Sequence, residues 1–266
     1  MRDRRQGRKA SAGSRRSPRA GRHRAPHAAD GPAILYGWHT VTAALANPAR
    51  RIRRLWTTEN AARRLVEDGI ALPARHELVR PDVIAARLGP DALHQGLLVE
   101  ADPLASPEIE DVENGLVLVL DQITDPHNVG AILRTAAAFG AGAVVTTARH
   151  SPEATGVLAK SASGALEYVP IVTVQNLARG LTALKERGFL LVGLDSTGES
   201  DLAAANVRAP LALVLGAEGK GLRQLTRATC DVVARLNLPG AIKSLNVSNA
   251  AALALYVATT RLGTDS

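Results

Sequence analysis

The sequence has a single cysteine, Cys230, and no apolar run that approaches the roughly 20 residues of a membrane-spanning helix. One cysteine excludes both a disulfide framework and a zinc site built from thiolates. The seven histidines are scattered without the spacing of metal ligands, so we expect no metal and no membrane segment. Aromatic residues are also scarce, with two Trp, three Tyr and two Phe. What remains is the composition of a globular protein, with 46% hydrophobic residues.

The positive charge of the chain is concentrated at its start. Residues 1–30 hold ten basic and two acidic residues, a net +8, whereas the whole chain of 266 residues carries +7. The remaining residues are therefore almost neutral. Because residues 1–30 contain no Leu, Ile, Val or Phe, they lack the apolar core of a secretory signal, and we predict a disordered basic tail. Such a tail is either a non-specific phosphate-binding arm or a solvated extension.

The chain after the tail divides into three parts, 33–103, 104–114 and 115–266. The first part alternates short strand and helix signals and is predicted to be a small α/β domain. Its expected helices are 41–45, 60–68 and 81–88, and its expected strands are 50–56 and 97–100. The second part is rich in acidic residues and is predicted to be a linker between domains.

The third part alternates apolar strands with helices. Strands are expected at 116–120, 143–147, 169–174, 190–194, 211–215 and 232–236. Helices are expected at 129–139, 153–163, 177–187, 221–228 and 246–262. This alternation predicts an α/β fold, a mostly parallel sheet covered by helices on both faces. Ligands of such sheets bind at the carboxyl ends of the strands, so the loops that follow the strands are the candidate sites.

The first strand of this part ends in a polar loop, 121–128, that leads into a helix containing Arg134. Asp125 or Asn128 could cap this helix. Arg134 is a charge in a largely apolar helix and needs a carboxylate or phosphate partner, so both a structural ion pair and a ligand contact are open. With one glycine before the helix, the loop is not the Gly-x-Gly-x-x-Gly dinucleotide signature.

Two further loops follow the fifth and sixth expected strands. The segment 216–221 has three glycines around Glu218, which favours either close approach to a ligand or a flexible turn, and its spacing is not that of a P-loop. The last loop brings Ser244, Asn246, Ser248 and Asn249 to the start of an alanine-rich helix. One capping residue would be enough there, so the surplus of polar side chains indicates binding.

Together the three loops resemble the motifs of the SPOUT superfamily, in its TrmH/SpoU branch of RNA ribose 2′-O-methyltransferases. The first motif is Asp-x-x-x-Asp-Pro-x-Asn-x-Gly-x-x-x-Arg-Thr-Ala from Asp121, the third is Ser-Leu-Asn-Val-Ser from Ser244, and the likeness spans 115–263. Residues 34–102 resemble the substrate-binding domain fused upstream in this family, from Tyr36-Gly37-Trp38-His39 to His94-Gln95-Gly96. The two-domain form is most similar to the members that methylate a guanosine ribose of 23S rRNA.

The resemblance implies a set of catalytic residues. Arg134 matches the family's catalytic arginine, and we expect it to hold an RNA phosphate and stabilise the developing alkoxide, since a guanidinium stays protonated. Asn128 and Glu218 are expected to orient Arg134. Ser244 and Asn246 are expected to face the ribose and the carboxylate of the cofactor.

The resemblance also implies a cofactor, a knot and a partner. The cofactor is S-adenosylmethionine, held by the main chain at Gly216, Leu236 and Leu245, although this chain reads Leu-Asn-Leu-Pro from Leu236 where the family usually has Ile-Pro-Met. The last three strands and the final helix are expected to form a trefoil knot. Members are homodimers, and the apolar helix 250–258 is compatible with a dimer interface or with burial inside one subunit.

The upstream domain is expected to choose the RNA. Its basic cluster, Arg50, Arg51, Arg53 and Arg54, would meet phosphate or form a charged strand face. The leading hypothesis is a cytoplasmic rRNA ribose methyltransferase. The alternatives are the same reaction on tRNA and a non-catalytic RNA-binding or ribosome-assembly protein on the same fold.

Overall fold

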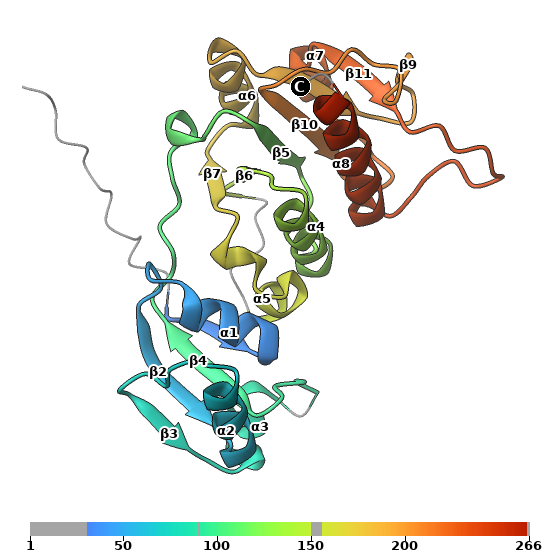
Figure 1. Ribbon diagram of the computed structural model, residues 1–266. Coiled ribbons are helices and arrows are strands. Elements are labelled where there is room, and N and C mark those ends of the chain that lie inside the picture. The colour runs from blue at the N-terminus through green and yellow to red at the C-terminus, as the bar shows by residue number, and fades with distance from the viewer. Residues whose placement is uncertain (1–30, 90, 150–155, 265–266) are drawn as a thin grey trace, which may run out of the picture.

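The computed structural model describes residues 31–89, 91–149 and 156–264, which form two sheets, one in each domain (Figure 1). The predicted basic tail, 1–30, lies outside the described residues, as does the start of the helix expected at 153–163. No described helix is both long and apolar enough to span a membrane.

The first domain is a four-stranded mixed sheet with three helices. The strand order is β1-β4-β2-β3, with β4 antiparallel to β1 and β2, and with β3 parallel to β2. Its elements are β1 (Ala33–Tyr36), α1 (Trp38–Ala46), β2 (Ile52–Thr57), α2 (Glu59–Glu67), β3 (His76–Leu78), α3 (Pro81–Leu88) and β4 (Leu97–Ala101). The two strands that the sequence did not predict are short, and β3 is exposed at all three residues, so it has no apolar alternation.

The second domain is a seven-stranded sheet in the order β7-β6-β5-β10-β8-β11-β9, and every paired ladder is parallel. The strands are β5 (Leu116–Asp121), β6 (Ala143–Thr147), β7 (Ile171–Val174), β8 (Leu190–Leu194), β9 (Ser200–Asp201), β10 (Leu211–Gly216) and β11 (Val232–Arg235). The helices are α4 (Pro126–Ala138), α5 (Gly156–Ala162), α6 (Leu177–Glu186), α7 (Gln224–Thr229) and α8 (Val247–Thr264), with a 3-10 turn η2 (Ala165–Glu167). The prediction of a mostly parallel α/β sheet is confirmed.

Both faces of this sheet are buried, which explains the continuous apolar strands. Along β5, Leu116, Leu118 and Leu120 face the core beneath α4 and α8, whereas Val117 and Val119 face the core beneath α6. A strand covered on both sides has no solvent-facing position, so it shows no alternation of polar and apolar residues.

Two helix starts differ from the sequence prediction for local reasons. Helix α4 begins at Pro126, three residues earlier, because the Asp125 carboxylate accepts the His127 N–H and Pro126 occupies the first turn. Helix α7 begins three residues later, because Gly221 has a φ of +63° and still belongs to the loop.

The segment between the domains packs against the second sheet over part of its length. It contains a 3-10 turn, η1 (Ile109–Asp111), and both Ile109 and Val112 are buried beside α6. Arg187 at the end of α6 donates to the carbonyl oxygens of Ile109, at 2.8 Å, and Val112. The half of the segment nearer to β5 is therefore held by the second domain.

Candidate active site

The first two loops leave the sheet side by side. Asp121 at the end of β5 and Gly216 at the end of β10 are register partners on adjacent parallel strands. A buried ion pair joins the loops just beyond this point: the Asp121 side chain is fully buried and accepts from Arg223 Nε at 2.6 Å and from the Arg223 backbone N–H at 3.1 Å. The sequence reasoning gave Asp121 no role. The available signal was an acid that closes an apolar strand, because such an acid needs a partner once it is buried.

The second loop is folded tightly on itself. The Gly221 N–H donates to the Ala217 carbonyl at 2.9 Å, and a β-carbon at Gly216 would lie 2.2 Å from the carbonyl carbon of Gly221. Glycine at position 216 is therefore required by close approach of backbone to backbone, and position 221 requires a positive φ. The glycines make a defined turn rather than a flexible one.

The carboxylate of Asp195, directly after β8, contacts the end of this turn at Gly221 and Leu222. Burial by itself would raise the pKa of Asp195, but hydrogen bonds from Thr197 and the Leu222 N–H, together with the Arg227 charge, lower it overall. A β-carbon at Gly221 would lie 2.7 Å from the Asp195 carboxylate. An ionised Asp195 thus fixes the returning half of the second loop.

The third loop is joined to both of the others. Asn246 Nδ2 donates to Asn128 Oδ1 at 3.0 Å, which links the third loop to the start of α4. Glu218 Oε1 accepts the Val247 N–H at 3.0 Å, so a side chain of the second loop satisfies a free amide in the first turn of α8. Three of the five predicted catalytic residues, Asn128, Glu218 and Asn246, therefore lie in one hydrogen-bonded cluster.

The other two predicted catalytic residues stand apart from this cluster. Arg134 on α4 and Ser244 in the third loop are both exposed, and neither side chain has a hydrogen bond or ion pair within residues 31–89, 91–149 and 156–264. A structural ion pair thus does not explain Arg134 in the described part of the chain. The bonds of Asn128 and Glu218 go to the third loop, and no described bond of either reaches Arg134.

The three residues expected at the cofactor surround the same edge of the sheet. Gly216 ends β10 and is half-buried, Leu236 follows β11 and packs against the core, and Leu245 precedes α8 with 36% of its surface exposed. No cluster of three or more potential metal ligands occurs in the described residues.

The basic cluster of the first domain is only partly available to a ligand. Arg50 is buried and pairs with Glu167 of the second domain at 2.6 Å, so its predicted contact with phosphate is wrong. Arg51 and Arg53 both pair with Asp102, and Arg54 lies 3.4 Å from Glu77. These three side chains remain 46–84% exposed. The sequence could not separate Arg50 from its neighbours, because its partner is distant along the chain.

The fold and the three joined loops define a class of α/β proteins, in which ligands bind to polar loops at the carboxyl ends of parallel strands. In this chain, a small mixed-sheet domain precedes that fold. Residues 115–256 match the SpoU rRNA Methylase family, and residues 34–107 match the RNA 2′-O ribose methyltransferase substrate-binding domain. The chain belongs to the SpoU rRNA methylase family.

Relatives and solved structures agree with this assignment. The chain is 39% identical to a 23S rRNA (guanosine-2′-O-)-methyltransferase RlmB of Pseudomonas putida, over 84% of this chain and 94% of the relative. It is 40% identical to the RlmB of Ralstonia nicotianae, over 85% and 94%. The SpoU methyltransferase AviRb of Streptomyces viridochromogenes in complex with AdoMet has a TM-score of 0.73 at 23% identity, over 87% of this chain and 90% of that chain. An AdoMet-bound rRNA methyltransferase of Sinorhizobium meliloti has a TM-score of 0.74 at 21% identity, over 87% and 88%. These two structures show likeness of fold.

Proposed function

We propose that the protein methylates the ribose 2′-hydroxyl of a guanosine in 23S rRNA, with S-adenosylmethionine as the methyl donor. The observation that carries the proposal is the cluster of Asn128, Glu218 and Asn246, which joins the three loops, together with an exposed Arg134 on the same helix as Asn128 that has no partner in the described chain. Relatives named as 23S rRNA guanosine methyltransferases, 39–40% identical over most of both chains, support the choice of substrate.

The proposed reaction sets the task of the catalytic residues. S-adenosylmethionine, when bound, supplies an electrophilic methyl group on a sulfonium. At the ribose, the residues of this chain would have to align the 2′-hydroxyl with that methyl group and help the hydroxyl proton to leave. Much of the rate comes from alignment, which is worth up to about 7–11 kcal/mol in favourable intramolecular reactions.

Arg134 is a clamp in this mechanism and not a base. A guanidinium stays protonated in proteins, so Arg134 cannot accept the hydroxyl proton. It can grip an RNA phosphate through two parallel N–H groups and stabilise the alkoxide that forms at the 2′-oxygen. The proton then passes to the phosphate or to water. Ser244, which is exposed, and Asn246 would face the ribose and the carboxylate of the cofactor.

The residues proposed to hold S-adenosylmethionine fit a ligand that is bound mainly by backbone. A glycine at position 216 keeps the end of β10 free of a side chain, and the turn from Gly216 to Gly221 is held by contacts of its own backbone. Leu236 and Leu245 would add main-chain donors and acceptors and apolar surface for an adenine ring. A preformed turn lowers the entropic cost of binding.

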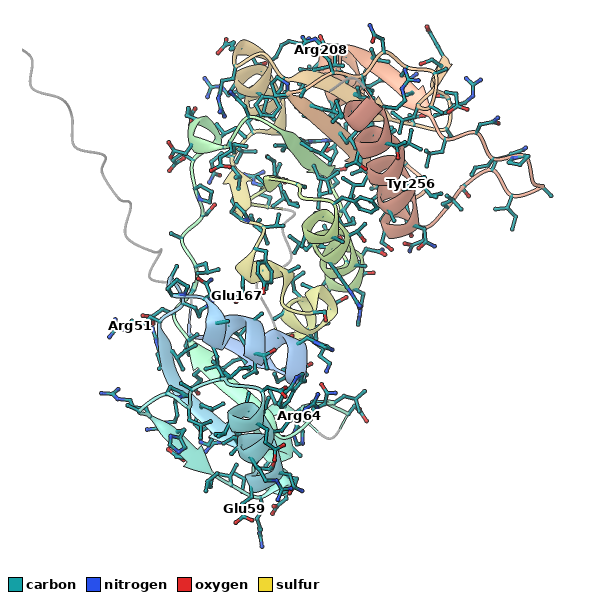
Figure 2. All side chains as sticks on the ribbon, in the orientation of Figure 1. Arg51, Glu59, Arg64, Glu167, Arg208 and Tyr256 are labelled. Atoms are coloured by element: carbon teal, nitrogen blue, oxygen red, sulfur yellow. The ribbon has the colours of Figure 1, made fainter. Side chains whose placement is uncertain are left out.

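We further propose that the protein works as a homodimer through α8. This helix and the last three strands of the domain would form the knot expected for this family. Leu253 and Tyr256 are 44% and 60% exposed and, with Asn249 and Thr260, lie on one stripe of the helix. Figure 2 shows Tyr256 on the open side of α8. A second copy would cover this stripe and bring further groups to Arg134 and Ser244.

The dimer is tested with Tyr256→Lys, which places a charge in the proposed interface. We expect light scattering to report dimers for the wild type and monomers for the variant, whereas Arg63→Gln on the exposed surface of α2 stays dimeric. A variant that remains dimeric would reject α8 as the interface.

The function itself is tested in cells with and without the gene, by mapping ribose methylation across rRNA and tRNA. One lost methyl group at a 23S guanosine is the expected result. Loss from tRNA would identify the tRNA enzyme instead. Calorimetry with S-adenosylmethionine separates both from a non-catalytic protein, which would bind none.

A further inference from the structure

A short segment of the second domain, α5 together with η2 (residues 156–167), forms most of the contact with the first domain (Figure 1). We call it the joint. Its polar contacts lie at two ends, its apolar contacts lie between them, and its opposite side touches the start of α4. Each of these contacts involves described residues that are far apart in the sequence.

The first polar contact is a buried ion pair across the domains. Arg50 donates to the Glu167 carboxylate from Nη2 at 2.6 Å and from Nε at 3.1 Å, and Asn47 Nδ2 donates to it at 2.7 Å. Only 4% of the Arg50 side chain and 2% of the Glu167 side chain are exposed. Figure 2 shows Glu167 where the two domains meet. Arg50 also donates to the Asp102 carbonyl at 2.9 Å, which ties the end of the first domain to the same pair.

The second polar contact involves Lys160 and the loop before β4. Lys160 Nζ donates to the Leu93 carbonyl at 2.8 Å and lies 3.5 Å from Gln95 Oε1. The same Gln95 oxygen accepts the Trp38 N–H at 2.8 Å, which satisfies the first turn of α1. Lys160 and Glu167 therefore hold the first domain at two separate points.

Close packing fills the space between these two points. Ala159 of α5 is part of the hydrophobic core of the first domain, and the Ala159 carbonyl accepts from Thr40 Oγ1 at 3.1 Å. A β-carbon at Gly164 would lie 2.8 Å from the Ala43 β-carbon and 2.9 Å from the His39 carbonyl oxygen. The domains thus share a core here, and a small shift of one against the other would meet hard contacts.

The other side of the joint contacts the first catalytic loop. Ser161 Oγ donates to the His127 carbonyl at 3.0 Å, directly before Asn128. A β-carbon at Gly130 would lie 2.4 Å from the Ser161 β-carbon, so α4 and α5 are packed backbone to backbone. One seven-residue helix therefore touches both the first domain and the start of the catalytic loop.

We propose that the joint fixes the RNA-binding domain at one position relative to Arg134, and that Glu167 is the positioning residue that determines which nucleotide is methylated. A tether would need no buried charges, because desolvation makes such a pair costly and a broken pair costlier still. A buried ion pair favours a single arrangement of the two domains, since each charge is satisfied in that arrangement and left unpaired in others. Misplacement of a reacting group by about 1 Å can reduce the rate roughly 100-fold.

This inference rests on the proposed function, so its experiment includes a measurement that does not. The test variant is Glu167→Gln, and the matched control is Glu67→Gln, the same substitution in an exposed pair of α2. The full chain is used for both. Hydrogen exchange of residues 156–167 reports the joint itself, calorimetry reports S-adenosylmethionine affinity, and steady-state kinetics with sequenced products report RNA methylation.

We expect Glu167→Gln to speed exchange in the joint at least tenfold and to leave S-adenosylmethionine affinity within about twofold. Its kcat/KM for rRNA should fall roughly 10- to 100-fold, with methyl groups appearing on neighbouring nucleotides. Glu67→Gln should match the wild type throughout. The double variant Arg50→Met/Glu167→Met, which replaces the pair by apolar groups of similar size, should slow exchange again and restore the single product.

Two results would overturn the inference. One is exchange in the joint that does not change in Glu167→Gln. The other is faster exchange while one nucleotide is still methylated at the wild-type rate. If the wild type methylates no RNA, the proposed function fails, and the exchange measurement still decides whether Glu167 holds the domains together.

Discussion

The joint and the catalytic loops lie on either side of the start of α4, and they differ in how far their polar groups are satisfied. At the joint, the Arg50–Glu167 pair is buried and each charge has several partners in the same chain. At the catalytic loops, Arg134 and Ser244 are exposed and have no partner within the described residues. A buried and paired charge, such as Arg50, stabilises the folded chain. An exposed charge without a partner among polar loops, such as Arg134, is available to a ligand.

This difference predicts opposite consequences for substitutions in the two regions. A change at Arg134 or Ser244 should reduce activity without reducing the free energy of unfolding, because neither side chain has a partner within the described residues. A change in the joint should reduce both.

Substitution of Arg134 should give the largest loss of activity. We expect Arg134→Ala to lower kcat by about 100- to 1,000-fold, the range seen when one stabilising donor is removed from a developing oxyanion. Arg134→Lys keeps the charge but cannot form the bidentate hydrogen bond to a phosphate, so its kcat should recover only a small part of the loss seen in Arg134→Ala. Single-turnover methylation measures the rate, and thermal unfolding should show no change in Tm for either variant. Wild-type activity in Arg134→Lys would reject the proposed role of Arg134 as a bidentate ligand of an RNA phosphate.

Substitution of Gly164 tests the joint without touching a charge. Gly164→Ala places a β-carbon against His39 and Ala43 at a φ of +89°. The control is Gly188→Ala, which has nearly the same φ, +88°, and no atom within 4 Å of the new β-carbon. Both variants carry the backbone cost of about 1–2 kcal/mol, and Gly164→Ala should lose about 1–3 kcal/mol more from overpacking. Urea unfolding measures the free energy of unfolding of both variants. Equal losses would mean that the two domains shift at the joint to accommodate the new β-carbon at little cost.

Deletion of residues 1–30 should have the smallest effect. Without the net +8 of this segment, we expect RNA binding to weaken several-fold and its dependence on salt to flatten, since fewer counterions are released. Filter binding at several salt concentrations measures the slope. The methylated nucleotide should not change, because the joint and not the tail positions the RNA. A new target after deletion would contradict this.

Much of the second domain could be predicted from the sequence, because its signals are local. The strands β6 and β8 begin and end where the apolar runs do, and the order of polar loops after β5, β10 and β11 placed the candidate site at one edge of the sheet. The ends of α4 and α7 could not be placed, since they depend on a cap at Asp125 and a positive φ at Gly221. The strand β3 escaped prediction because its three residues are all exposed.

The sequence by itself determined the class of the fold and the three loops. Its resemblance to the TrmH/SpoU motifs identified the catalytic candidates Asn128, Arg134, Glu218, Ser244 and Asn246, because each motif lies within about 15 residues. Tertiary structure alone decided which charges are free. Arg50 and Arg51 are neighbours of the same type, yet Arg50 is buried against Glu167 while 84% of the Arg51 side chain is exposed. The physical reason is that burial and ion pairing depend on groups more than a hundred residues away, and no local pattern encodes that distance.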